Sequence, residues 1–410
     1  MMKLSTFITE QQNAHMEHLE DMIFNDGVSG ARAAISSLQN LRDMLAGHSK
    51  NKVNVTVKWD GAPAIFAGVD PTDGKFFVAK KGVFNKNPKV YKTAAEVDKD
   101  ASGDLAAKLK VALIEFNKLG IKSGVYQGDL MFTDDKRIET IAGEKYIVFH
   151  PNTIVYAVPS GTPLAVQIQK AKIGVVWHTT YTGSSFETMT ASFGKSIIDH
   201  MTKVPSVWMD DATYRDISGN ATFTAKETKE VNIYLSDADK ALMRISASSK
   251  DVLRLIQNDE ELKQKIKTFN NTFVRAGEPF PNPKSHVKEL YQYIMDWYQK
   301  EIDSKKTDKS KQEWTNKRNR VAQLVFTNVS DLENVFKLMN YIVQAKQMII
   351  NKMNYASTLG TFLLTSNGFK ATSHEGYVAI DHLGQAVKLV DRLEFSRANF
   401  SSDVLKGWQK

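Results

Sequence analysis

The secondary-structure pattern of this sequence changes twice, and these two changes constrain the fold most. Short strand-like runs with turn residues fill residues 51–183, a long helical pattern covers 236–356, and strand texture returns in FLLTSNGFKATSHEGYVAIDHLGQAVKLV. Isolated strands need partners, so we expect the C-terminal strands to rejoin the sheets formed before residue 183. The sequence therefore predicts an α+β protein whose β-domain is interrupted by a helical insertion.

The predicted domains follow these changes of texture. Residues 1–48 form an N-terminal helical segment, residues 49–235 and 357–410 form the β-domain, and residues 236–356 form the all-helical insertion. A single helix over 94–119 interrupts the early strands. Within the insertion, AGEPFPNPKS breaks the helical pattern because its prolines cannot continue a helix, and Ser330 with Glu333 predicts a capping box that opens a helix.

Composition narrows the possible partners. The 410-residue chain has a formal charge of +8, which favours a polyanion such as nucleic acid or a nucleotide. It has no cysteine, which excludes disulfides, thiolate metal sites and cysteine nucleophiles. The N-terminus lacks an apolar signal region and no run of eighteen apolar residues occurs, so we expect a cytoplasmic protein without a membrane partner.

The stretch NVTVKWDGAPAIFAG places a lysine where it could react. Alternation of valines with polar residues from Val53 to Lys58 predicts a half-buried strand, with Lys58 at its end on the less apolar face. Asp60 and Gly61 then predict a sharp turn. A merely solvated strand-end lysine is the alternative interpretation of Lys58 taken alone.

Three further charged residues lie in strand texture beside glycine or among β-formers. They are Asp129 in YQGDLMF, Glu375 in HEGYVAI and Lys388 in AVKLV. With Lys58 they suit nucleotidyl transfer, in which an uncharged lysine amine attacks the α-phosphate of a nucleoside triphosphate and pyrophosphate leaves. Carboxylates hold a divalent cation on the phosphates, and a second lysine stabilises the charge of the α-phosphate.

These segments resemble the motifs of the covalent nucleotidyltransferases, which comprise ATP-dependent DNA and RNA ligases and mRNA capping enzymes. KWDG resembles motif I, AKKG motif Ia, GDLMF motif III, TIVYAV motif IIIa, EGYV motif IV and VKLV motif V, all in the family's order. The resemblance covers roughly residues 50–183 and 360–392. It implies a ligase-type nucleotidyltransferase fold with ATP-grasp-like antiparallel sheets.

The resemblance also implies a role for each matching residue. Lys58 is the nucleophile that becomes lysyl-AMP, Asp60 and Gly61 shape the turn behind it, and Lys388 grips the α-phosphate. Asp129 contacts ribose or metal, and Glu375 binds the metal, Mg²⁺ or Mn²⁺. Lys80 contacts ribose or a nucleic-acid phosphate, and Tyr156, with Phe149 as its rival, stacks on the purine of ATP. Aromatic residues in strands also commonly belong to the core, which is the alternative for both rings.

Some positions depart from the family pattern. Lys80 stands where the family usually has arginine, Asp129 replaces glutamate, and Val390 replaces a second motif V lysine.

About twenty residues follow Lys388, too few for the C-terminal OB-fold domain of the DNA ligases and capping enzymes. By analogy we expect an RNA ligase of the bacteriophage kind, which joins a 5′-phosphate to a 3′-hydroxyl, in the host cytoplasm if the gene is phage-borne.

Two other functions stay open at this point. The chain could be a DNA ligase or a GTP-using nucleotidyltransferase of the same superfamily. It could also be an inert nucleic-acid-binding protein with a ligase-like core.

Residues 304–320, SKKTDKSKQEWTNKRNR, combine basic residues with an aromatic ring. This combination suits single-stranded nucleic acid, and a solvated helix face is the alternative. The residues concerned are Lys305, Lys306, Lys309, Lys311, Trp314, Lys317, Arg318 and Arg320. The histidines point to no metal: His15 and His18 are expected on a surface helix, and His178 in a core or edge strand with substrate contact second.

Overall fold

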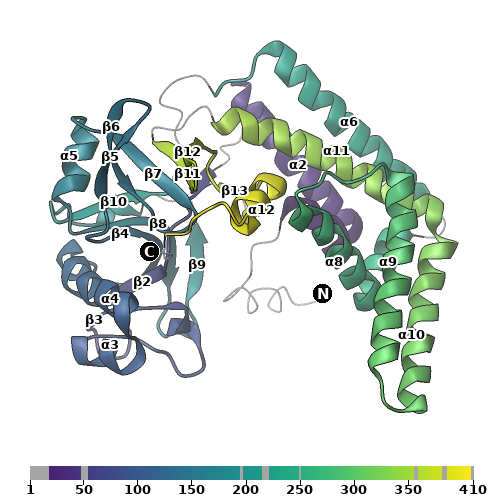
Figure 1. Ribbon diagram of the computed structural model, residues 1–410, viewed down its shortest axis with the longest axis horizontal. Helices are drawn as coiled ribbons and strands as arrows, with labels where there is room; N and C mark the ends of the chain where they lie inside the picture. The colour runs from purple at the N-terminus through teal and green to yellow at the C-terminus, as the bar shows by residue number, and fades with distance from the viewer. Residues whose placement is uncertain are drawn as a thin grey trace.

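The computed structural model describes residues 18–47, 54–193, 197–214, 221–248, 251–354, 359–380 and 386–407. The strands gather in one body and the long helices in a second, elongated body (Figure 1). The C-terminal helix α12 (Arg392–Phe400) lies between the two bodies. Helices and antiparallel strand pairs both contribute extensively, as the α+β prediction requires.

The first sheet joins the two ends of the β-domain. Its antiparallel order is β1 (Asn54–Lys58), β13 (Gly376–Ile380) and β14 (Ala386–Leu389). The C-terminal strands therefore pair with a strand that precedes the helical block, as predicted. One face of this sheet, which includes Val55, Tyr377 and Leu389, is buried in the core of the helical body.

The second sheet has the order β10 (Val207–Asp211), β8 (Ile173–Thr182), β4 (Val125–Phe132), β2 (Ala64–Val69) and β3 (Phe76–Ala79), and β9 (Thr190–Phe193) pairs with β8. Only the β10–β8 pairing among these is parallel. Helix α4 (Gly103–Phe116) covers one face, where Phe116 packs on Trp177 with ring centroids 5.2 Å apart. Short helices η4 (Lys81–Phe84), η5 (Asn117–Leu119) and η6 (Ile198–His200) complete this region.

The third sheet has the antiparallel order β12 (Gly368–Ala371), β11 (Gly360–Thr365), β7 (Ile154–Pro159), β6 (Glu144–Phe149) and β5 (Arg137–Ile141). Helix α5 (Pro163–Lys170) packs beside β6 and β7. Aromatic side chains from the second and third sheets share one hydrophobic cluster with Trp59, which follows β1; they are Phe132, Phe149, Tyr156 and Trp208.

The helical body includes η3 (Leu19–Asp21), α1 (Met22–Asn25), α2 (Gly27–Leu45), α6 (Ala225–Ala247), α7 (Val252–Asn258), α8 (Glu260–Ala276), α9 (Pro283–Ser304), α10 (Asp308–Thr327) and α11 (Val329–Met353). Helix α2 packs against α6 and α11, so the N-terminal helix joins the helical body and is no separate segment. The insertion also begins earlier than the predicted residue 236, because Thr224 caps α6 with a capping box.

Local chemistry explains several helix boundaries. Helix α8 ends at Gly277, which adopts φ 69°, and α9 begins after Asn282, whose side chain accepts from the Ser285 amide at 3.1 Å. The predicted break in AGEPFPNPKS is therefore confirmed. The capping box predicted at Ser330 is wrong, because α11 already begins at Val329 and Asn328 precedes it.

The predicted helix over 94–119 is divided. Helix α3 (Ala94–Asp100) ends at Ala101, which has an extended backbone, and α4 begins anew at Gly103. No helix within the described ranges is long and apolar enough to cross a membrane.

Candidate active site

The first sheet positions Lys58 with its side chain away from the helical core. Val55 and Val57 face that core, so alternation along β1 puts Thr56 and Lys58 on the opposite face. The Lys58 ammonium forms an ion pair with the Glu375 carboxylate, and these side chains are 28% and 11% exposed. The predicted nucleophile and the predicted metal carboxylate are therefore in direct contact.

Strand register places Lys388 on the same face as Lys58. Lys58 lies opposite Gly376 in β13, and Lys388 in β14 lies opposite Val378, two residues further along. Residues opposite one another share a face, as do alternate residues in a strand, so both lysines project from one side of the sheet. Burial raises the pKa of the Glu375 carboxyl, against the opposing charges of Lys58 and Lys388.

Asp129 joins this group from the second sheet. Burial raises the pKa of its carboxyl to about 7, and the negative charges of Glu375 and Asp60 act in the same direction, while Lys58 and Lys81 oppose them. Gly61 allows the close approach of the KWDG turn to β4, because a Cβ at Gly61 would lie 2.5 Å from the Cβ of Asp129. The glycine of this motif is thus required by packing.

Asp60 supports the turn as a buried hydrogen-bond acceptor. Its carboxylate accepts from the Asn152 side-chain amide at 2.6 Å and from the backbone amides of Thr153 and Ile154 at 2.7 and 2.8 Å. The Asp60 amide in turn donates to the Tyr156 hydroxyl at 2.7 Å. Asp60 therefore fixes the turn after β1 to the start of β7, in agreement with a shaping role.

Tyr156 and Phe149 lie in the core, unlike the base-stacking role expected of one of them. Both side chains are 0% exposed. Their rings stack on each other with centroids 5.5 Å apart, and Trp59 covers Tyr156 at 5.1 Å. A purine has no access to either ring in this arrangement, because neighbouring aromatic residues occupy the space around them.

Of the two lysines in AKKG, Lys81 and not Lys80 contributes its charge to this cluster. Lys80 pairs with Asp100 at 3.0 Å and lies 5.9 Å from the ring centroid of Tyr91. Lys81, the next residue, is close enough for its charge to lower the pKa of Asp129. The sequence could have suggested Lys81, because AKKG contains two adjacent lysines and either could have been assigned to the site.

Two histidines also lie near the cluster. The Nε2 atom of His178, in β8, is 3.8 Å from the Asp129 carboxylate, and burial together with the Lys58 charge lowers the pKa of His178 to about 4. His178 is thus neutral at physiological pH. His18 is not on a surface helix as expected: it forms a β-bridge with Lys388, and burial lowers its pKa to about 3. His15 lies outside the described residues.

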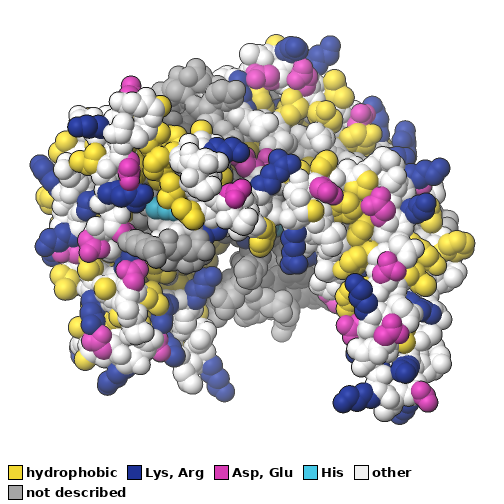
Figure 2. Space-filling model, in the orientation of Figure 1, with side chains coloured by type: hydrophobic (Ala, Val, Ile, Leu, Met, Phe, Trp, Pro, Cys, Tyr) yellow, Lys and Arg dark blue, Asp and Glu magenta, His cyan; other side chains and the backbone are white. Residues whose placement is uncertain are grey.

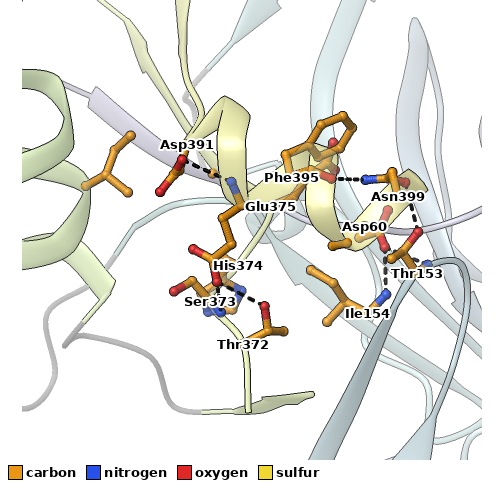
Figure 3. A pocket seen from close by; sticks show the side chains of 14 residues that line it. Asp60, Thr153, Ile154, Thr372, Ser373, His374, Glu375, Asp391, Phe395 and Asn399 are labelled. Atoms are coloured by element: carbon orange, nitrogen blue, oxygen red, sulfur yellow. Dashed lines mark hydrogen bonds between the residues drawn. The ribbon is translucent and has the colours of Figure 1, made fainter. Parts of the chain in front are cut away.

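A small cavity of about 20 Å³ lies behind Glu375 and has room for one water. Figure 3 shows Thr372, Ser373, His374 and Glu375 on one side of it and Asp60, Thr153 and Ile154 on the other. Helix α12 lines another part of the cavity with Glu394, Phe395, Ala398 and Asn399. From α12, Glu394 accepts from the Ser373 amide at 3.3 Å and from the Thr372 hydroxyl at 3.2 Å, which steadies the segment that carries Glu375. Sequence reasoning missed Glu394.

The predicted nucleic-acid residues of 304–320 lie elsewhere, at the end of α9 and along α10 in the helical body. This basic segment therefore lies away from the sheets that carry the site (Figure 1).

The carboxylates suit a hard cation held jointly with a substrate. Within the described ranges, no three His, Cys, Asp or Glu residues form a group that could hold a metal. Mg²⁺ is commonly bound by one or two carboxylates plus substrate phosphates, and Asp129 and Glu375 can supply these. The raised pKa of Asp129, caused in part by neighbouring carboxylates, indicates negative charge that a cation would relieve.

Comparison with known proteins gives one match. A family model described as "Family of unknown function (DUF6267)" matches residues 13–404. No curated protein and no solved structure matches this chain.

Proposed function

The chain belongs to this family of unknown function, and we propose that it is an ATP-dependent RNA ligase with a ligase-type nucleotidyltransferase core. One observation carries the proposal: Lys58 pairs with Glu375, Lys388 shares its sheet face, and Asp129 lies within the same charge cluster. These residues come from four separate segments of the chain, so their meeting is a property of the fold. The choice of RNA over DNA rests on analogy with the bacteriophage RNA ligases and not on the motifs, which the whole superfamily shares.

The first step would form a covalent lysyl-AMP. Glu375 contacts the Lys58 ammonium and, with a pKa raised by burial, accepts a proton more readily than an exposed carboxylate. The uncharged amine then attacks the α-phosphate of ATP: a nitrogen–phosphorus bond forms, the bond to the β-phosphate oxygen breaks, and pyrophosphate leaves. Lys388, on the same face, would stabilise the charge on the α-phosphate.

Two further transfers would complete ligation. The 5′-phosphate of an RNA strand attacks the lysyl-AMP phosphorus, and the nitrogen–phosphorus bond breaks as AMP passes to the strand. The 3′-hydroxyl of the other end then attacks the 5′-phosphate, a phosphodiester forms, and AMP leaves. Catalysis of this kind depends on positioning and electrostatics. Asp129, together with Glu375 once it has passed its proton to solvent, would hold Mg²⁺ or Mn²⁺, which neutralises phosphate charge when bound.

The direct test is nucleotide labelling. Purified protein with Mg²⁺ and ATP labelled on its α-phosphate should acquire a label that survives denaturing electrophoresis, and Lys58→Ala should abolish it. Lys75→Ala is the matched control, because Lys75 is a lysine with a 72% exposed side chain in the loop before β3. A wild-type protein that takes up no label, or a Lys58→Ala protein that is labelled normally, would contradict the proposal. A parallel reaction with GTP identifies the nucleotide.

A further inference from the structure

Helices α9 and α10 form a projecting arm in the helical body. The two helices pack along each other and are joined by residues 305–307, and the other end of the arm packs on α8 and α11. Helix α9 has 22 residues, which at 1.5 Å per residue gives an arm roughly 30 Å long. The joined, free end of the arm stands away from the sheets (Figure 1).

The free end of the arm is basic. Figure 2 shows several Lys and Arg side chains there, at the lower right of the view, with Asp and Glu side chains among them. Between residues 300 and 320, Asp and Glu occur only at 301, 303, 308 and 313. Lys and Arg occupy twice as many positions, which are Lys300, Lys305, Lys306, Lys309, Lys311, Lys317, Arg318 and Arg320.

Some of these basic side chains form no ion pair with any residue that the structure describes. Lys305 pairs with Glu301, and Arg320 pairs with Asp259 and Glu261. In contrast, Lys306, Lys309 and Lys311 are exposed, and none of them forms an ion pair with any described residue. Lys306 lies in the linker, and Lys309 and Lys311 lie in the first turn of α10, so like charges crowd this end of the arm and favour a polyanion.

Tryptophan rings lie beside these charges. The Trp314 ring is partly exposed. The ammonium groups of Lys305 and Lys317 lie 4.4 and 5.0 Å from its centroid. Trp297 lies 6.0 Å from Trp314, and Lys265 covers Trp297 at 2.7 Å. A lysine over a ring can move to a phosphate when a base stacks on that ring, since both positions are attractive to the ammonium.

We propose that the free end of the arm binds single-stranded RNA, with Lys306, Lys309 and Lys311 contacting its phosphates and Trp314 lying against an unpaired base. Single strands fit better than duplexes because only unpaired bases present a face for stacking. The inference deepens the proposed function, on which its choice of RNA rests, but binding at the arm does not use Lys58 or its neighbours. The arm would then hold the substrate at a surface separate from the reacting site.

The test measures fluorescence anisotropy of a labelled single-stranded RNA oligomer with full-length protein. The arm variant carries Lys306→Gln, Lys309→Gln and Lys311→Gln. The control variant carries Lys226→Gln, Lys229→Gln and Lys240→Gln, which remove three exposed lysines from α6 and change the net charge equally. We expect the arm variant to bind roughly tenfold or more weakly at low salt, and the slope of log affinity against log salt to fall by about 2, since each single-strand phosphate contributes about 0.7.

A tryptophan variant and two other ligands test whether the arm binds single-stranded RNA specifically. Trp314→Phe, which retains a ring, should bind RNA more weakly under conditions in which circular dichroism and urea unfolding show the variant to be fully folded. Equal affinity of the arm variant and the wild type would overturn the proposal, as would an equal loss in the α6 control. Equally tight binding of a duplex or of anionic lipid vesicles would reduce the arm to a general anionic surface and also overturn it. Labelling of the wild-type protein by ATP is scored separately, so failure of the ligase proposal and failure of the arm proposal give different results.

Discussion

Replacement of Asp129 by asparagine should change how the stability of the protein depends on pH. In the folded chain, burial first and nearby carboxylates second raise the pKa of Asp129 from 3.8 to about 7. The Asp129 side chain is 21% exposed, so solvent screens it only partly. Asparagine keeps the shape of the side chain but cannot ionise.

The sign of the effect follows from proton binding. Between pH 4 and pH 7 the folded state holds a proton on Asp129 that the unfolded state has lost, so the free energy of unfolding falls as the pH rises through this window. At about 1.4 kcal/mol per pH unit, the wild type should lose about 4 kcal/mol across the whole window. Between pH 5 and pH 8 the loss should be roughly 3 kcal/mol, and Asp129→Asn should avoid it.

Urea unfolding at a series of pH values, with EDTA present, measures this difference. Asp129→Asn should be close to the wild type at pH 4 and more stable at pH 8. Asp98→Asn, which changes a carboxylate that is 55% exposed, is the control and should keep the wild-type pH profile. If Asp129→Asn and the wild type showed parallel stability profiles from pH 4 to pH 8, the argument that Asp129 lies in a buried carboxylate cluster would be refuted.

Two further predictions concern buried polar groups. Asp60→Ala should lower the free energy of unfolding by about 4 kcal/mol in urea titrations, because the buried amides of Thr153 and Ile154 lose their acceptor; a loss below about 1 kcal/mol would contradict this. Lys346→Met should lower the free energy of unfolding by about 3–5 kcal/mol, since it leaves the carboxylate of Glu20, which is 2% exposed, without its main partner. Adding Glu20→Leu should restore part of this loss. A double variant less stable than Lys346→Met alone would refute this reasoning.

The sequence alone determined those features that depend on local periodicity. Alternation of polar and apolar residues set the face of Lys58 on β1, and the return of strand texture after the helical block predicted that the C-terminal strands pair with early ones. Asp60 and Gly61 predicted the turn. Each of these inferences needs only the pattern within one segment, because a strand with one buried face fixes its own orientation.

The tertiary structure decided which residues of different segments meet. That Lys81 rather than Lys80 lowers the pKa of Asp129, and that His178 lies 3.8 Å from the same carboxylate, depends on how the strands of the second sheet are placed. The burial of Tyr156 and Phe149 depends on the approach of two sheets, since a strand pattern does not say whether its apolar face meets a ligand or another sheet. Contacts between segments far apart in the chain follow from sheet register and layer packing, and neither is contained in the periodicity of a single segment.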